Sequence, residues 1–210
     1  GDAPYAYIWN SNNVYLSDDT IANPNFSPDS IGTWNYIIKV TDNKGCIASD
    51  TVDIVVDSLP LVDAGRDTAI CLGNSTTIGT NTVSGVNYNW NTSDNLSDSS
   101  ISNPVFTSSN SGTVKYFVTG TIANTGCKNN DTITITVHPL HTTNAGRDTA
   151  ICLGTTISIG AAPIAGRNYS WSPSTGLNND TISNPSFYTT SPGSYSYILN
   201  STIQATGCSS

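Results

Sequence analysis

One ten-residue sequence occurs twice in this chain of 210 residues, and it constrains the fold more than any other feature. It reads Ala-Gly-Arg-Asp-Thr-Ala-Ile-Cys-Leu-Gly at residues 64–73 and again at 145–154, an offset of 145 − 64 = 81 residues. Ten identical residues at a fixed offset indicate an internal repeat, and a unit of this length fits a small domain. The chain is therefore expected to be a window on an array.

The period extends far beyond this decapeptide. A Tyr-x-Trp motif, an Asn-Pro pair followed by Phe, and a Gly-Cys pair each occur three times at corresponding places. These landmarks predict a partial repeat at residues 1–58 that lacks its N-terminal strands, a complete repeat at 59–138, and a repeat at 139–210 that lacks its last strand. We call them the first, second and third repeats.

Hydrophobic periodicity predicts strands. In the second repeat Ile133, Ile135 and Val137 alternate with threonines, which is typical of a sheet with one face on a core and one in water. Turn residues separate several such runs, and no long run has the helical period. Strands at this spacing, with one Trp in each repeat, indicate an all-β Greek-key β-sandwich. The expected core anchors are Trp9, Trp90 and Trp171.

Composition excludes several functions. The net charge is −8, with an isoelectric point near 4.2, which disfavours nucleic acid and anionic membranes as partners. No apolar run approaches the ~20 residues that span a bilayer. Nucleophilic catalysis needs a base beside a Ser or Cys, but the two histidines, His138 and His141, share one linker. We therefore predict no enzyme, and this pair is too few for a zinc site.

Calcium is the one cofactor that the loops permit. Asp18 and Asp19 follow the first Trp strand, and Asp94 and Asp98 follow the second. Calcium prefers clustered carboxylate and carbonyl oxygens, but these residues form no Asp-x-Asp-x-Asp run. Solvated turn formers are the favoured interpretation, so no cofactor and no metal site is predicted.

Five cysteines in a chain rich in Ser and Thr indicate an oxidising compartment. Pairing within repeats joins Cys71 to Cys127 and Cys152 to Cys208, each 127 − 71 = 56 residues apart, and leaves Cys46 to a partner outside the fragment. Pairing across the joints, at a separation of 71 − 46 = 25, joins Cys46 to Cys71 and Cys127 to Cys152. Spacing leaves both open. We favour pairing within repeats, because each repeat then oxidises independently, although the decapeptide must bring Cys71 near Cys127.

A triplet of Asp, Ser or Thr, and an aliphatic residue or Ala also recurs, several times at equivalent places in different repeats. Asp-Thr-Ile also simply begins a strand, so a modification signal and a plain strand start are both open for these triplets. The hydroxyls concerned are Thr20, Ser30, Thr51, Ser58, Thr68, Thr132, Thr149 and Thr181.

The combined motifs carry a family resemblance over the whole chain. Ala-Gly-x-Asp-x-x-Ile-Cys-x-Gly, then Tyr-x-Trp-Ser-Pro-x-x-Gly-Leu at 169–177, then Asn-Pro, Gly-Cys and Asp-Thr-x-x-Ile-x-Val, resemble the PKD-like, immunoglobulin-like repeats of Bacteroidota cell-surface adhesins, including the gliding-motility adhesin. The second repeat departs at residues 91–96, and the first lacks the Gly-Leu. The resemblance implies tandem immunoglobulin-like sandwiches, type IX secretion, display on the bacterial outer surface, no catalytic site and O-glycosylation at the triplets.

The predicted function is a structural spacer in a secreted adhesin or filament. Its partners are then neighbouring repeats of the same chain, together with surface polysaccharide or other filament chains. The alternative is a carbohydrate- or protein-binding module that uses the loops after the Trp strands, around residues 91–100 and 178–183. A third interpretation is an accessory repeat attached to a secreted enzyme. Binding of glycans by the second repeat would favour the module, and rigid, inert behaviour would favour the spacer.

Overall fold

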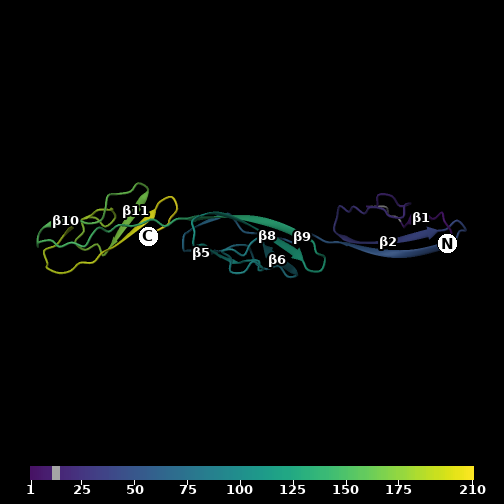
Figure 1. Cartoon of the computed structure of the whole chain (residues 1–210), viewed down its shortest axis with the longest axis horizontal. Coiled ribbons are helices and arrows are strands. Elements are labelled where there is room, and N and C mark those ends of the chain that lie inside the picture. Colours follow the sequence, from purple (N-terminus) through teal and green to yellow (C-terminus); the bar gives the residue numbers. More distant parts are fainter. Residues whose placement is uncertain (11–14) are drawn as a thin grey trace. The chain divides into compact units, whose positions relative to one another are not determined.

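The computed structural model describes residues 1–10 and 15–210, and its regular elements there are 13 strands (Figure 1). By compactness the chain divides into two units. The first comprises Gly1–Leu61, Val83–Asn87 and Gly120–Asn129, and the second comprises Val62–Thr82, Tyr88–Thr119 and Asn130–Ser210. In the described ranges no helix is long and apolar enough to cross a bilayer.

The first repeat forms one antiparallel sheet. Its strands are β1 (Ala6–Trp9), β2 (Gly32–Thr41) and β3 (Ile47–Val56), in the order β1-β2-β3. The β2–β3 hairpin is in register over its whole length and turns at residues 42–46. Tyr36 of β2 is buried and packs edge-on against Phe26, which in turn contacts Trp34. An aromatic cluster thus covers one face of this sheet.

The second repeat is a two-layered sandwich. One layer has the order β4-β9-β8-β6 and the other pairs β5 with β7. The only parallel pairing recorded for the described residues joins β4 to the end of β9. The bounds are β4 (Thr68–Cys71), β5 (Ser75–Thr77), β6 (Val86–Trp90), β7 (Val105–Thr107), β8 (Gly112–Ile122) and β9 (Lys128–His138).

This order confirms the predicted fold class. An immunoglobulin-like sandwich has its third, sixth and seventh strands in one sheet, and β6, β8 and β9 occupy those places. The chain is therefore an all-β protein of tandem immunoglobulin-like repeats.

The core of the second repeat lies between these layers. Ile133, Ile135 and Val137 of β9 are buried, as the alternation predicts, and pack with Trp90 and Phe106. Burying aromatic and β-branched side chains at close packing provides most of the favourable free energy in so small a domain.

Each Trp makes the same hydrogen bond. The indole nitrogens of Trp9, Trp90 and Trp171 donate to main-chain oxygens in the following loop, at 3.0, 2.9 and 2.9 Å. Trp90 and Trp171 are 2% and 3% exposed, whereas Trp9 is half-buried. A buried indole needs such an acceptor, so the repeated contact fixes how each loop leaves its strand.

The third repeat has two antiparallel pairs. β10 (Thr156–Ser158) pairs with β12 (Ser186–Tyr188), and β11 (Arg167–Ser172) pairs with β13 (Ile198–Ile203). They correspond to β5, β7, β6 and the second half of β8 at the 81-residue offset. Residues 149–152, the counterpart of β4, form no strand.

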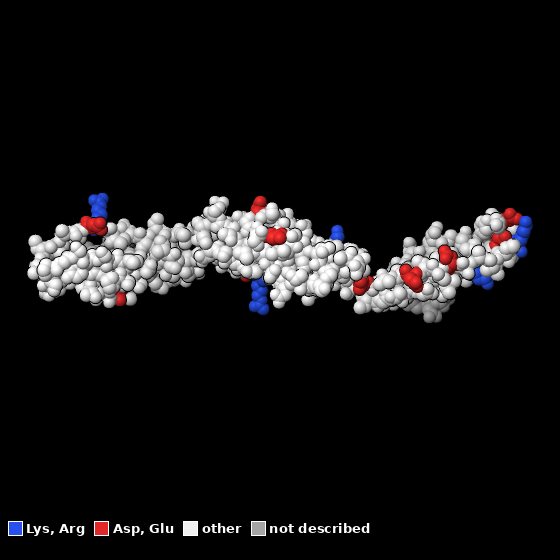
Figure 2. Space-filling view, turned by 90° about the horizontal axis from the view of Figure 1, so that it is seen from below, with Lys and Arg blue, Asp and Glu red and all other residues white. Residues whose placement is uncertain are grey.

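Charge is sparse on the surface. The chain has 7 Lys and Arg against 15 Asp and Glu, and the face drawn in Figure 2 shows a few of each separated by wide uncharged areas. Outward positions are instead occupied by Thr, Ser and Asn, which fit exposed strands and turns.

Candidate functional site: the disulfide between repeats

A disulfide joins Cys71 to Cys208, across 137 residues, and links the second repeat to the third. The Cα atoms are 5.5 Å apart. The favoured pairs, Cys71–Cys127 and Cys152–Cys208, are therefore wrong, and Cys71 does not pair with Cys46 either. Cys46, Cys127 and Cys152 are free in the described part of the chain.

The length of β9 explains the correction. Cys71 pairs with His138 at the last residue of this strand, whereas Cys127 directly precedes its first residue, Lys128. The strand has 11 residues. At about 3.3 Å per residue its ends are separated by roughly 35 Å, far beyond the ~7 Å limit between bridged Cα atoms. A bridge within one repeat is therefore sterically impossible.

The decapeptide carries Cys71 to the end of its sandwich. β4 runs parallel to β9 from Thr68, opposite Ile135, to Cys71. The amide of Leu72 then donates to the His138 carbonyl at 2.8 Å, and a turn follows at once. The cysteine thus lies where the second repeat ends and the linker begins.

A recurrent hairpin turn carries the partner cysteine. We call residues 42–46, 123–127 and 204–208 the Gly-Cys turns. In the third repeat the amide of Gly207 donates to the Ile203 carbonyl at 2.8 Å, and the Ile203 amide donates to the Cys208 carbonyl at 2.9 Å. Gly207 has φ +73°, a backbone conformation that favours glycine. Cys208 is fully buried there.

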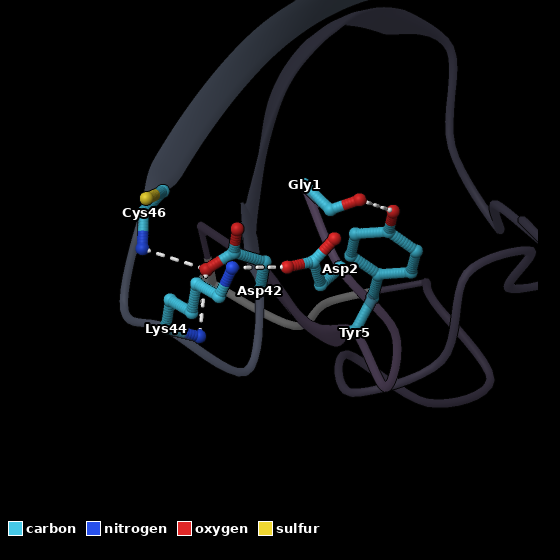
Figure 3. A network of polar contacts seen from close by, with 6 residues as sticks. All are labelled: Gly1, Asp2, Tyr5, Asp42, Lys44 and Cys46. Atoms are coloured by element: carbon cyan, nitrogen blue, oxygen red, sulfur yellow. Dashed lines mark hydrogen bonds and ion pairs between the residues drawn. The ribbon is translucent and has the colours of Figure 1, made fainter.

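A side-chain oxygen holds the cysteine amide in every copy of the turn. Thr206 accepts from Cys208 at 3.3 Å, and Thr125 accepts from Cys127 at 3.4 Å. In the first repeat Asp42 takes this role at 2.8 Å (Figure 3).

In the first repeat the turn is also charged. The hydrogen bond from the Cys46 amide is the main cause that lowers the pKa of the Asp42 carboxyl from its ordinary value. Lys44 donates its own amide to Asp42 and forms an ion pair with Asp2 at 2.5 Å (Figure 3). The turn geometry that presents a cysteine is therefore maintained by different side chains in different repeats.

The linker after His138 is held against the third repeat. A ring nitrogen of His141, Nε2, lies 2.7 Å from the hydroxyl of Ser201, which is fully buried. The Thr143 hydroxyl donates to the Ser210 carbonyl, and Arg167 donates to the Thr142 carbonyl. The linker thus runs beside the strand that leads to Cys208. Sequence reasoning placed His141 on the surface, but the residue fastens this linker.

The same linker arrangement occurs one repeat earlier. Asn129 donates its side-chain amide to the carbonyl of buried Pro60 at 3.1 Å, so the linker before the second repeat lies beside the strand that follows Cys127. The Gly-Cys turn of a repeat therefore lies close to the linker that enters that repeat.

The loops after the Trp strands are tied to their own repeat. The Tyr116 hydroxyl donates to the Asp94 carbonyl at 2.8 Å, and Asn91 accepts from the Phe117 amide at 3.0 Å. The Ser100 hydroxyl donates to Asp98 at 2.6 Å, which is the main cause that lowers the pKa of that carboxyl. These contacts occupy the polar groups that a ligand would need.

Carboxylates of the first loop make similar local contacts. Asp18 accepts from both the amide and the hydroxyl of Thr20 at 2.7 Å. Among the described residues no group of three or more His, Cys, Asp or Glu side chains converges as a metal site would require.

The eight triplet hydroxyls differ in one case. Thr68 lies in β4 and is half-buried, because that strand pairs with β9. The hydroxyl of Thr181 donates to Asn179 at 2.8 Å. The other seven candidates are exposed, namely Thr20, Ser30, Thr51, Ser58, Thr132, Thr149 and Thr181.

Comparisons with known proteins give likenesses among multi-domain structures. No family model matches the sequence, and no curated protein matches it. An I-band fragment of titin, I67–I69, has 11% identity over 96% of this chain and 84% of that chain, with a TM-score of 0.44. The eight N-terminal immunoglobulin domains of the Down syndrome cell adhesion molecule have 11% identity over 95% and 35%, with a TM-score of 0.45. A mixed-linkage glucan-binding protein of Bacteroides ovatus, SGBP-B, has 16% identity over 98% and 55%, with a TM-score of 0.22.

Proposed function

We propose that this chain is a spacer segment of a large secreted cell-surface adhesin or filament, in which disulfides couple successive repeats in series. The observation that carries the proposal is the Cys71–Cys208 bond, because it crosses a repeat boundary. A bond within a repeat would stabilise that repeat alone. A bond across the boundary restrains the joint, which is otherwise the most flexible part of a tandem array.

The period extends this bond to other joints. Shifted back by 81 residues, the same pairing joins Cys127 to the decapeptide cysteine of a preceding repeat. Shifted forward, it joins Cys152 to the Gly-Cys turn of a following repeat. The three free thiols, at Cys46, Cys127 and Cys152, are then halves of further joint-spanning bonds. Each interior repeat of such an array carries two of them, one at each end.

A tensile load explains why such bonds are useful. When the chain is pulled at its termini, the load passes through Cys71–Cys208 and bypasses the residues between them. The separation of 137 residues, at roughly 3.5 Å each, amounts to about 480 Å of chain that the bond withholds. The repeats can then lose their packing under load without a large gain in length.

The proposed location is the outer surface of a bacterium, reached by type IX secretion. Disulfides persist in oxidising surroundings outside the cytosol. The exposure of seven of the eight triplet hydroxyls supports O-glycosylation, and glycans there would shield strands that otherwise invite edge-to-edge pairing. Neighbouring repeats are the principal partners, with surface polysaccharide or other filament chains as further ones.

Single-molecule pulling of the whole chain tests the spacer role. We expect the oxidised chain to extend by residues 1–70 and 209–210 only, and the reduced chain to gain about 480 Å more. Cys127→Ser should leave both lengths unchanged, because this thiol is free. Equal lengths before and after reduction would refute the proposal.

A further inference from the structure

The third repeat contains a cleft of about 790 Å³ that corresponds to no ligand pocket of an immunoglobulin-like sandwich. One wall is formed by decapeptide residues 145–153 and the other by residues 191–197, while Trp171 and Phe187 also line it. At the 81-residue offset these walls correspond to residues 64–72 and 110–116 of the second repeat. In the second repeat β9 lies beside β4 on one edge and β8 on the other.

The contacts of β9 define what this place accepts. Asp131 accepts from the Ala64 amide at 2.9 Å, and the Thr134 amide donates to Asp67 at 2.8 Å. From Ile135 onward the strand runs parallel to β4. Its three inward side chains, Ile133, Ile135 and Val137, are at most 3% exposed.

The third repeat has the same acceptor groups without the strand. Ala145 and Asp148 are the counterparts of Ala64 and Asp67. Ala64 is fully buried, whereas Ala145 is exposed. Residues 149–152 and 194–197 lie outside any strand, although their counterparts belong to β4 and β8.

Apolar side chains also remain uncovered along this cleft. Tyr195 is 40% exposed, and Leu153 is 60% exposed. Uncovered apolar groups between two strand edges are a template for an added strand.

We propose that the cleft binds an extended strand of the pattern Asp-Thr-Ile-Thr-Ile-Thr-Val, paired parallel to residues 149–152 and antiparallel to residues 194–203. The Asp of the strand accepts from the Ala145 amide, and Asp148 accepts from an amide of the strand. The occupant is thus a segment with the closing pattern of this repeat family, supplied from outside residues 139–210. The inference does not rest on the spacer role.

Charge and shape make this choice of occupant specific. A strand with an acidic residue at a different register would place its carboxylate against Asp148 instead of the Ala145 amide. A strand without aliphatic residues at alternate positions would leave Trp171 and Phe187 uncovered. Because the side-chain period of a strand is two, a slip of one residue reverses which side chains face the cleft.

Titration of the whole chain with a synthetic peptide of sequence 131–138 tests the proposal. We expect one peptide to bind per chain, with a change in Trp fluorescence and slowed hydrogen exchange of the Ala145 amide. A peptide in which Ile135 is replaced by Asp should not bind. Asp148→Ala should weaken binding by about tenfold, since a hydrogen bond to a charged acceptor is lost.

Asp67→Ala is the matched control. Its repeat already holds β9, so this variant should bind the peptide with unchanged affinity. Equal weakening by the two substitutions would overturn the proposal. If the chain self-associates without peptide, and Asp148→Ala abolishes this, a second copy is the occupant and the commitment to a separate strand is wrong.

A covalent version removes the dependence on peptide affinity. Residues 130–138 can be appended directly after Ser210, because Asn129 corresponds to Ser210 at the offset. The extended chain should resist denaturant better than the same extension carrying the Ile135→Asp change. Equal resistance of the two extended chains, with Ala145 unprotected in both, would refute strand binding.

Discussion

Reduction of the Cys71–Cys208 bond should destabilise the chain by an amount that its loop length sets. In the chain-entropy model, closing a loop of 137 residues lowers the free energy of the folded state relative to the unfolded one by about 5 kcal/mol. Measured disulfide contributions are typically about 2–4 kcal/mol, because strain and residual structure reduce the effect. We therefore expect reduction to lower the free energy of unfolding by about 2–5 kcal/mol.

Two equivalent cysteines give a matched pair of variants. Cys208 and Cys127 occupy the same Gly-Cys turn in successive repeats, but Cys208 is bonded and Cys127 is free. The assay is guanidinium unfolding followed by Trp fluorescence, with and without reductant. Comparing each protein with itself removes the cost of placing a Ser at the buried Cys208 site.

The expected pattern is a difference of response. Wild type and Cys127→Ser should lose the same stability on reduction, and Cys208→Ser should not respond to reductant. The reasoning would be refuted if Cys127→Ser became insensitive to reductant while Cys208→Ser kept its response, because Cys127 would then be the bonded residue.

Two further predictions concern packing and titration. Gly79 has φ +75°, and a Cβ there would lie 2.0 Å from the Ser102 carbonyl oxygen, whereas Gly85 has φ +78° and open space around it. Gly85→Ala should cost about 1–2 kcal/mol for its left-handed backbone, and Gly79→Ala a further 1–3 kcal/mol, measured by thermal unfolding; equal costs would contradict the packing described. Ser100→Ala should raise the pKa of Asp98 in an NMR titration, because the hydroxyl bond that lowers this pKa is lost. The folded pKa is the lower one, so this stabilisation is present above the unfolded pKa and lost as pH falls through the folded pKa; an unmoved titration would contradict the assignment.

The repeat period made the fold predictable. Trp90 and Trp171 are buried where the period places them, and the alternation in residues 132–137 gave the inward face of β9. Such patterns report local periodicity and burial, which a single sequence carries directly.

The disulfide could not be predicted in the same way. A period of 81 repeats every separation equally, so spacing favours neither 25, 56 nor 137 residues. The decision lies in the register of β4 against β9, which puts Cys71 at the opposite end of the strand from Cys127. Had β4 been recognised as parallel to the last strand, a partner in the next repeat would have been the only one within reach.

The same limit applies to the His141–Ser201 contact, which joins residues 60 positions apart. Nothing in the linker sequence indicates this partner. The cleft, by contrast, could be anticipated, because residues 139–210 contain the decapeptide without the alternating run that covers it in the second repeat.

Disulfide mapping tests the joint between repeats most directly. The seven Lys and Arg residues place each cysteine on its own tryptic peptide, so the digest of the unreduced chain can be read without ambiguity. We predict that the peptide of residues 67–115 is joined to that of residues 168–210. Finding residues 67–115 joined to residues 116–128 instead would place the bond within one repeat and contradict the coupling of repeats in series.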